Sequence, residues 1–428
     1  MKKIAIVGGG VGGMAAAYDL ARAGNLVTIF DSSSQLGGLA AGFKRPNWKW
    51  SLEEFYHHWF QTDHAILNLM AEIGLRQNVR FFSPKTVVFH KDNFYPLDSP
   101  LSAILFPGFS LLDKARFGFV TLYLKYLSSW QPLEKYTAYE WLQKYYGNNI
   151  FQTQYEPLLQ GKFSQYYQQV NMAWFWARFK ARTTRLGTYV GGFQKFIDDF
   201  TRVLMESGVH IKLNTQVMSI QPLNGGNLSL ITSDSQVEFD QVLVTTSPQL
   251  LAKMAPSLNQ GYLDNLLAMK SIGAIALIFS LKNQLSTQGY YWFNLPKSKG
   301  FPFLALVEHT NFVSAEYFGG EHIIYCGDYL DSQHEYFKLT QEQLVEKFLP
   351  SLERINPRFK RDWVNESWLF RVPYAQPVPF VNHSANIPSL QTPMTNLFFA
   401  SMSQVYPWDR GTNYAVELSR RTAKIMMS

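Results

Sequence analysis

The stretch that decides the fold is KKIAIVGGGVGGMAAAYDLARAGNLVTIFD, residues 2–31. It contains a short apolar run, a cluster of glycines, a helical pattern and a second apolar run that ends on Asp31. These patterns predict a strand, a tight turn, a helix and a second strand. An acid about twenty residues beyond the turn completes the fingerprint of dinucleotide binding, G-x-G-x-x-G. Its glycines are Gly8, Gly10 and Gly13.

Each position of this motif has a mechanical role. Gly8 permits the sharp turn, Gly10 lets a pyrophosphate approach the backbone, and Gly13 lets the helix pack closely on the strand. The free amides and the positive dipole end of the helix favour phosphate binding. We expect Asp31 to accept hydrogen bonds from the adenosine ribose hydroxyls. The alternative is a glycine-rich turn without a ligand.

Composition bounds the class of protein and its location. The 428 residues are 46% hydrophobic, 16% aromatic and 17% charged, which describes a folded chain with more than one core. The net charge of +7 comes without a basic tract, so nucleic acid is not an expected partner. A single cysteine, Cys326, indicates a reducing compartment. The first apolar run is too short for a signal peptide, and we expect a cytoplasmic protein.

The region 101–127 is the longest approach to an apolar stretch, but proline and charged residues interrupt it. It therefore predicts amphipathic helix, not a membrane span. Two interpretations stay open for it. The apolar residues could pack inside a helical subdomain, or they could form a peripheral contact with the inner face of the membrane.

A second glycine pair, Gly37 and Gly38, follows the second predicted strand. In this feature the sequence resembles the superfamily of FAD-dependent amine oxidases, protoporphyrinogen oxidases and phytoene desaturases, where the chain passes the extended cofactor again at this point. The resemblance implies FAD in place of NAD. Amine oxidases of this superfamily carry a lysine in the strand that resembles 272–281, and this chain has none there. That departure argues against amine oxidation.

The order of predicted elements indicates an α/β protein built from interleaved parts. A Rossmann-like FAD-binding domain is discontinuous, because no long linker divides the chain. A helical insertion rich in aromatic residues and a mixed α+β substrate domain interrupt it. The predicted boundaries are 1–97, 186–248 and 391–428 for the FAD-binding domain, 98–185 for the insertion and 249–390 for the substrate domain.

Two histidines stand among aromatic residues ahead of a predicted helix. The pattern His58-x-Phe60-x-Thr62 is similar to one in UDP-galactopyranose mutases, which implies a place beside the flavin ring for His58 and makes it our first candidate catalytic residue. A packed, hydrogen-bonded pair with His57 is the alternative. A metal site is not predicted, because no third ligand stands at a suitable spacing.

The resemblance also implies cofactor contacts further along the chain. A strand containing Val217 matches the one that presents backbone groups to the adenine. Near the C-terminus, Tyr406 matches an aromatic residue near the flavin face and is our second candidate catalytic residue, with substrate contact. Relatives commonly have glycine and an acid where this chain has Ser401 and Met402, so Asp409 is a candidate replacement. The residues expected beside the flavin at the start of the last helix are Gly411, Asn413 and Ala415.

The expected reaction is hydride transfer from a bulky, apolar small-molecule substrate to flavin N5. One alternative is a non-redox flavoenzyme that resembles UDP-galactopyranose mutase and acts on a nucleotide sugar. Another is a flavin-binding protein without catalytic activity.

Overall fold

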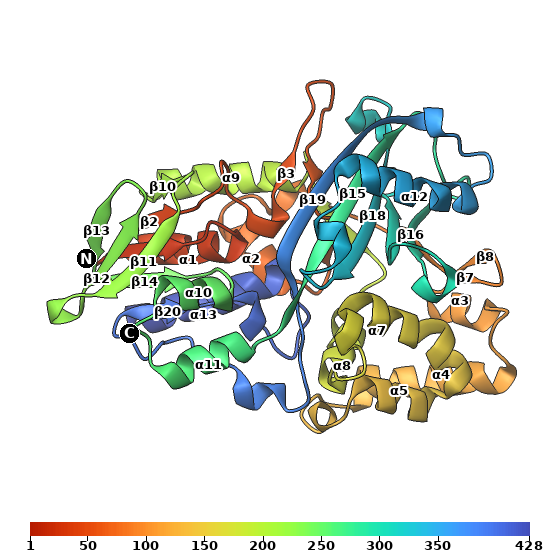
Figure 1. Cartoon of the computed structure of the whole chain (residues 1–428), viewed down its shortest axis with the longest axis horizontal. Coiled ribbons are helices and arrows are strands. Elements are labelled where there is room, and N and C mark those ends of the chain that lie inside the picture. The colour runs from red at the N-terminus through yellow and green to blue at the C-terminus, as the bar shows by residue number, and fades with distance from the viewer.

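The computed structural model describes residues 1–428, except for the side chain of Pro100. A layer built on a parallel sheet, a larger mixed sheet and a lobe of helices make up the molecule (Figure 1). The predicted α/β class is confirmed. The division into three sequence domains stays a prediction.

The parallel sheet collects strands from three distant parts of the chain. Its order is β10-β2-β1-β14-β20, and all neighbours run parallel. Parallel sheets place the carboxyl ends of their strands at one edge, where α/β proteins bind ligands. The strands are β1 (Lys3–Val7), β2 (Leu26–Phe30), β10 (His210–Lys212), β14 (Gln241–Val244) and β20 (Leu397–Phe399).

Helices and a small sheet cover the two faces of this layer. Successive β1 residues alternate, so Ile4 and Ile6 pack with the helices on one face, and Ala5 and Val7 pack with the other side. The first face carries α1 (Val11–Arg22), α2 (His64–Glu72), α9 (Phe193–Glu206) and α13 (Thr412–Met427). The second carries β11 (Val217–Pro222), β12 (Leu228–Thr232), β13 (Gln236–Phe239), α10 (Pro248–Met254) and α11 (Gln260–Ala268).

The mixed sheet has the order β19-β15-β18-β17-β16-β7-β8, with α12 (Gln341–Ile355) packed against it. The predicted boundary at residue 97 groups residues 85–96 with the nucleotide-binding layer, but β7 pairs with β16 of this sheet. An alternating pattern specifies a strand, and it leaves the strand's partner open. The strands are β7 (Lys85–His90), β8 (Asn93–Pro96), β15 (Ser271–Leu281), β16 (Tyr290–Asn294), β17 (Ala305–Glu308), β18 (His322–Leu330) and β19 (Val364–Pro377).

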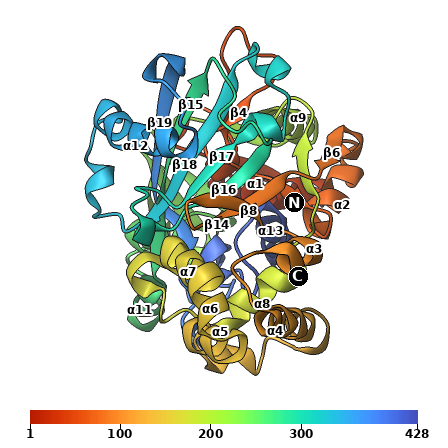
Figure 2. The same ribbon diagram turned by 90° about the vertical axis from the view of Figure 1, so that its right-hand side faces the viewer.

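The helical lobe lies below the mixed sheet (Figure 2). It packs around an aromatic core, and the side chains of Ser110, Thr137 and Asn171 cap three of its helices. Its helices are α3 (Pro100–Leu105), α4 (Leu111–Leu122), α5 (Ala138–Tyr146), α6 (Asn148–Ile150), α7 (Glu156–Phe163) and α8 (Met172–Ala181). Short strands join the parts: β3 (Gly42–Phe43), β4 (Leu52–Glu53), β5 (Trp59–Phe60), β6 (Val79–Phe82) and β9 (Leu186–Tyr189).

Large apolar side chains of α3, α4 and the turn that follows are exposed to solvent. Leu111 and Leu112 are 86% and 77% exposed. No helix in the described part of the chain has the length and hydropathy needed to cross a bilayer. We call this group the apolar face; it consists of Leu101, Ile104, Leu105, Leu111, Leu112, Phe119, Leu122, Tyr126 and Leu127.

Candidate active site

The turn after β1 has the shape that the glycine motif requires. Gly8 has a φ of +110°, and a Cβ on Gly13 would stand 2.1 Å from the Gly8 carbonyl oxygen. A Cβ added to Gly10 would have free space around it: apart from the two chain neighbours, no heavy atom of the described residues would lie within 4 Å of it. Gly10 is also the N-cap of α1 and has no side chain to cap it. The amides of the first helical turn therefore face an open space, which fits a pyrophosphate group.

The second glycine pair lies against this turn. The Gly37 amide donates to the Gly9 carbonyl oxygen at 2.9 Å, and a Cβ on Gly38 would stand 3.3 Å from the Gly10 Cα. The Asp31 carboxylate accepts from the amides of Gly9 at 2.7 Å and Ser33 at 2.8 Å. Asp31 thus fixes the first turn, and its contact with a ribose stays a prediction.

Val217 lies close to the same end of the parallel sheet. It is the first residue of β11, and two residues earlier the Thr215 amide donates to the Asp31 carbonyl oxygen at 2.8 Å. The structure therefore brings Asp31, which follows β2, close to Val217, which begins β11. These are the two residues predicted to bind the adenosine. The adenine contact of Val217 itself remains a prediction.

The start of α13 forms a second open helix terminus. Gly411 is the N-cap of α13. A Cβ added to Gly411 would lie more than 4 Å from every heavy atom of the described residues other than its chain neighbours. The Asn413 Oδ1 atom accepts from the Ile66 amide at 3.2 Å and so holds α2, while its contact with the flavin stays a prediction. The carbonyl oxygen of Ala415 would stand 3.1 Å from a Cβ on Gly12, which explains the close crossing of α1 and α13.

His57 and His58 lie between these termini and the mixed sheet. His57 Nδ1 donates to the Phe55 carbonyl oxygen at 2.5 Å, which leaves Nε2 as an acceptor. Burial lowers the pKa of His57 to about 4. Burial, aided by Arg182 and His57, lowers the pKa of His58 to about 3. His58 Nδ1 is buried without a hydrogen-bond partner among the described residues. Both rings are therefore neutral at pH 7, and the His58 ring has a free polar atom.

Tyr406 occupies a more structural position than the sequence predicts. Its hydroxyl donates to Glu134 Oε2 at 2.7 Å and accepts from Asn171 Nδ2 at 3.1 Å. Both partners belong to the helical lobe. Burial and the Glu134 carboxylate raise the pKa of Tyr406 far above its ordinary value. A catalytic role for Tyr406 stays a prediction, and its hydroxyl links the last loop to the lobe.

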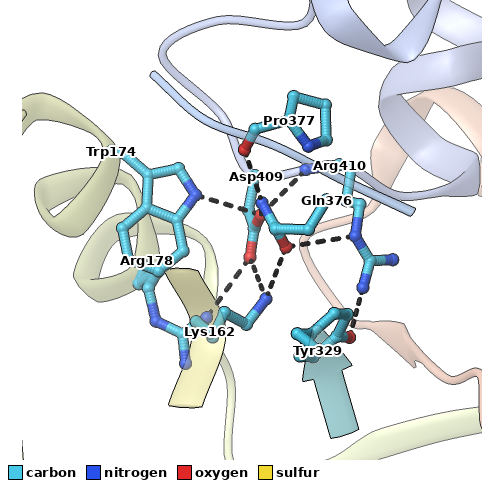
Figure 3. Close-up of polar contacts among 8 residues, drawn as sticks. All are labelled: Lys162, Trp174, Arg178, Tyr329, Gln376, Pro377, Asp409 and Arg410. Carbon is cyan, nitrogen blue, oxygen red and sulfur yellow. Dashed lines mark hydrogen bonds and ion pairs between the residues drawn. The ribbon is translucent and has the colours of Figure 1, made fainter. Parts of the chain in front are cut away.

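A group of buried charges, absent from the sequence-based prediction, surrounds Asp409 (Figure 3). The Asp409 Oδ2 atom is 3.2 Å from Lys162 Nζ and 3.2 Å from Arg178 Nη1. Its Oδ1 atom accepts from Trp174 Nε1 at 3.0 Å and from the Arg410 amide at 3.1 Å. Desolvation raises the pKa of Asp409, but the surrounding cations outweigh it and hold the pKa well below its usual range.

Lys162 and Arg178 of the lobe pair with Asp409, and its replacement of the acid missing at Met402 stays a prediction. The Ser401 hydroxyl shares a hydrogen bond of 2.8 Å with the Tyr374 hydroxyl. One signal in the sequence could have revealed the charge cluster. Trp174 and Arg178 stand four residues apart in an aromatic helical run, so both face the same buried side of α8.

An apolar hollow opens beside the charge cluster, between the histidine segment and the mixed sheet. Arg410 lines this first hollow, and it also lines a second hollow next to Asp409. Most of the wall of the first hollow is aliphatic or aromatic, and its volume of about 30 Å³ is that of a few water molecules at most. The wall consists of Leu39, Phe55, Tyr56, His57, Ala274, Ile275, Asp328, Tyr329, Val372, Ala375 and Arg410.

Known proteins place this geometry in a family. A segment of 78 residues, 18% of this chain, is 33% identical to zeta-carotene desaturase from Synechocystis sp., and the match covers 16% of that protein. A proposed protoporphyrinogen oxidase from Exiguobacterium sp. has the same fold, with a TM-score of 0.80, 18% identity, and coverage of 100% of this chain and 99% of that one. Reduced UDP-galactopyranose mutase gives a TM-score of 0.79 at 14% identity, with coverage of 100% and 96%.

The family model described as flavin containing amine oxidoreductase matches residues 11–427. The open turns at Gly10 and Gly411 fit the cofactor of such proteins, and FAD is confirmed over NAD. The chain therefore belongs to the family of flavin-containing amine oxidoreductases.

Proposed function

We propose that the protein oxidises a bulky, largely apolar substrate. Bound FAD supplies a hydride acceptor at its N5 atom. The observation that carries the proposal is the composition of the wall of the hollow beside the open start of α13, which includes Ile275, Val372 and Ala375. Its aliphatic and aromatic wall excludes water and holds an apolar group in place. The proposal requires this wall to open further when a bulky substrate binds.

His57 is one of the polar residues that line this hollow, together with Asp328 and Arg410. Because His57 is neutral and its Nδ1 proton is donated to Phe55, its Nε2 atom can accept a hydrogen bond from the substrate. His57 would therefore orient a polar group of the substrate.

The test is anaerobic bleaching of the flavin absorbance of the purified protein. We expect an isoprenoid or tetrapyrrole fraction to bleach it, and Ala375→Leu, which narrows the hollow, to slow the bleaching. Leu250→Met, at an exposed position of α10, is the control and should bleach at the wild-type rate. Absence of bleaching by every apolar fraction, in protein that retains its flavin, would contradict the proposal.

A second candidate function is favoured by the charges around Asp409. A cluster of lysine and arginine suits the pyrophosphate of a nucleotide sugar, and UDP-galactopyranose mutase has the same fold. Such an enzyme would need prior reduction of its flavin and would consume no electron acceptor. Turnover of a nucleotide sugar without stoichiometric acceptor would select this function over oxidation.

We further propose that the apolar face rests on the cytoplasmic surface of a membrane. Lys114, Arg116 and Lys125 outnumber Asp113 within 101–127, so anionic lipid is the favoured surface. The proposal predicts cosedimentation with anionic vesicles.

Changing Leu111 and Leu112 to serine together should abolish the sedimentation, because each leucine contributes about 1.5 kcal/mol or more when it is buried in lipid. The matched control changes Leu250 and Leu267, which are exposed on α10 and α11. Equal sedimentation of both double variants would refute membrane contact through this face.

A further inference from the structure

The hollow beside the histidine segment lies between the two turns assigned to the cofactor and the mixed sheet. On one side, Leu39 follows the second glycine pair, and Arg410 precedes Gly411 at the start of α13. On the other side, β15, β18 and β19 supply the wall. A group bound in this hollow therefore stands where the cofactor-binding layer meets the sheet.

Tyr329 and Arg410 bring hydrogen-bond donors to the hollow. The Arg410 Nε atom donates to Gln376 Oε1 at 3.1 Å, and its Nη2 atom donates to the Tyr329 hydroxyl (Figure 3). These two bonds use only part of the N–H groups of the guanidinium, and the bond that Tyr329 accepts leaves its own hydroxyl proton for another partner. Because Tyr329 is only 8% exposed, that partner reaches it through the hollow.

His57 brings a hydrogen-bond acceptor to the same hollow. Its Nδ1 proton is donated to the Phe55 carbonyl oxygen, so its Nε2 atom carries a lone pair. Burial lowers the pKa of His57, and the charge of Arg410 adds to this effect. The imidazole and the guanidinium are therefore close enough to act on one ligand, and that ligand has to donate one hydrogen bond and accept another.

The strand β18 is shaped to keep a second tyrosine beside these groups. Tyr325, Gly327 and Tyr329 lie on one face of the strand, because side chains alternate. A Cβ on Gly327 would stand 2.7 Å from Tyr56 Cε1, so the Tyr56 ring occupies the space that another side chain would fill. A glycine inside a strand weakens it. Here it lets Tyr56 reach the wall of the hollow.

The charges around the hollow favour a neutral ligand. The Asp328 carboxylate is 2.7 Å from Lys297, and Asp409 is paired with the cations of the lobe. A cationic group would meet the positive charge of Arg410. An anionic group would place its oxygens against the Nε2 lone pair of His57. A hydroxyl group is neutral and both donates and accepts, so it satisfies the acceptor and the donors together.

We infer that the substrate carries a neutral hydroxyl group, which donates to His57 Nε2 and accepts from Tyr329 or Arg410 inside the hollow. The volume of about 30 Å³ fits such a group and not a whole substrate. The apolar remainder needs the opening of the wall that the proposed function already requires. The inference rests on that proposed oxidation and specifies the class of its substrate. It assigns specificity to Tyr329 and Arg410, which the sequence-based prediction did not include.

The experiment is calorimetric titration of the flavin-loaded protein under nitrogen with isoprenoids of equal carbon number. Linalool is the alcohol, and as a tertiary alcohol it has no carbinol hydrogen to lose, so binding is measured without its oxidation. The hydrocarbon myrcene reports the apolar contacts alone, and geranic acid and geranylamine carry charged head groups. We expect linalool to bind about tenfold more tightly than either charged compound, because each of these leaves a buried polar group unpaired.

His57→Phe and Tyr329→Phe should each weaken the binding of linalool about tenfold and leave that of myrcene unchanged, because each removes one hydrogen bond to the hydroxyl group. Flavin absorbance and the unfolding temperature show whether a variant keeps its fold, and if one variant loses its flavin the other decides. Tyr290→Phe, in β16 of the same sheet and outside the wall of the hollow, is the matched control and should bind both compounds as the wild type does.

Binding of linalool that neither variant weakens would mean that the hollow holds water only, and would overturn the inference. Tighter binding of geranic acid or geranylamine would overturn it as well, because it would assign the hollow to a charged head group. Failure of the proposed oxidation is seen separately, in the flavin bleaching. A protein that binds linalool through His57 but is bleached by no substrate would keep the hydroxyl site and lose the oxidase.

Discussion

Replacing Gly10 with alanine separates the needs of the cofactor from those of the fold. Gly10 has φ −69° and ψ 171°, which is ordinary extended backbone for any residue. Its added methyl group would meet no described heavy atom within 4 Å other than its chain neighbours. We therefore expect the free energy of unfolding of the flavin-free protein to change by no more than about 0.5 kcal/mol.

The same methyl group stands where the pyrophosphate must approach the backbone. At an FAD concentration of about 100 times the wild-type dissociation constant, the wild type gains about 2.7 kcal/mol of stability from binding. If Gly10→Ala weakens binding about 100-fold, the gain falls to about 0.4 kcal/mol. The assay is thermal unfolding with and without FAD, supported by flavin fluorescence.

Gly13→Ala is the contrasting variant. Its Cβ would stand 2.1 Å from the Gly8 carbonyl oxygen, so α1 must move away from β1. We expect a loss of about 2 kcal/mol in the flavin-free protein itself. A Gly10→Ala protein that gains as much stability from FAD as the wild type, or that unfolds without FAD, would refute the role assigned to this turn.

Three further predictions concern the site. Asp409→Asn leaves the cations around it without their counter-charge and should lower the free energy of unfolding by about 3 kcal/mol, measured in urea; an unchanged midpoint would contradict this. The pKa values of His57 and His58, about 4 and about 3, lie below the ordinary value of 6.5. Between these pH values the unfolded chain binds more protons than the folded protein does. The free energy of unfolding should therefore fall as the pH drops from 6.5 towards 4. Glutamine at both positions should flatten that part of a plot of unfolding temperature against pH, and an equally steep plot would argue against it. Tyr406→Phe removes the hydrogen bond to Glu134 and should cost about 1.5 kcal/mol with flavin absorbance intact, whereas a loss of flavin would indicate a cofactor role.

The parts of the fold that the sequence predicts correctly depend on local patterns. The unit β1–α1–β2 is marked by a change of hydrophobic period and by glycines whose spacing has a steric cause. That signal lies within about thirty residues, so no knowledge of distant contacts is needed.

The sequence leaves open those partners that are distant in the chain. The strand β7 joins β16, about 200 residues later, and no periodicity encodes that choice. The Asn413 side chain accepts a hydrogen bond from the Ile66 amide, and no local pattern predicts that partner. The charge cluster combines residues from α7, α8 and the loop before α13. The spacing of Trp174 and Arg178 marks one buried face of α8, but only the structure shows that Lys162 and Asp409 meet it.

The cost of that cluster bears on its purpose. Apolar residues of similar size would stabilise the junction between the lobe and the last loop at least as well as a buried ion pair does. An arrangement that needed only stability would therefore not require Arg178 beside Asp409. Asp409 lowers the cost of holding Lys162, Arg178 and Arg410 together, and Arg410 also lines the hollow beside the histidine segment. Charged side chains kept at such a cost are typical of functional sites, and stability of the fold alone does not require them.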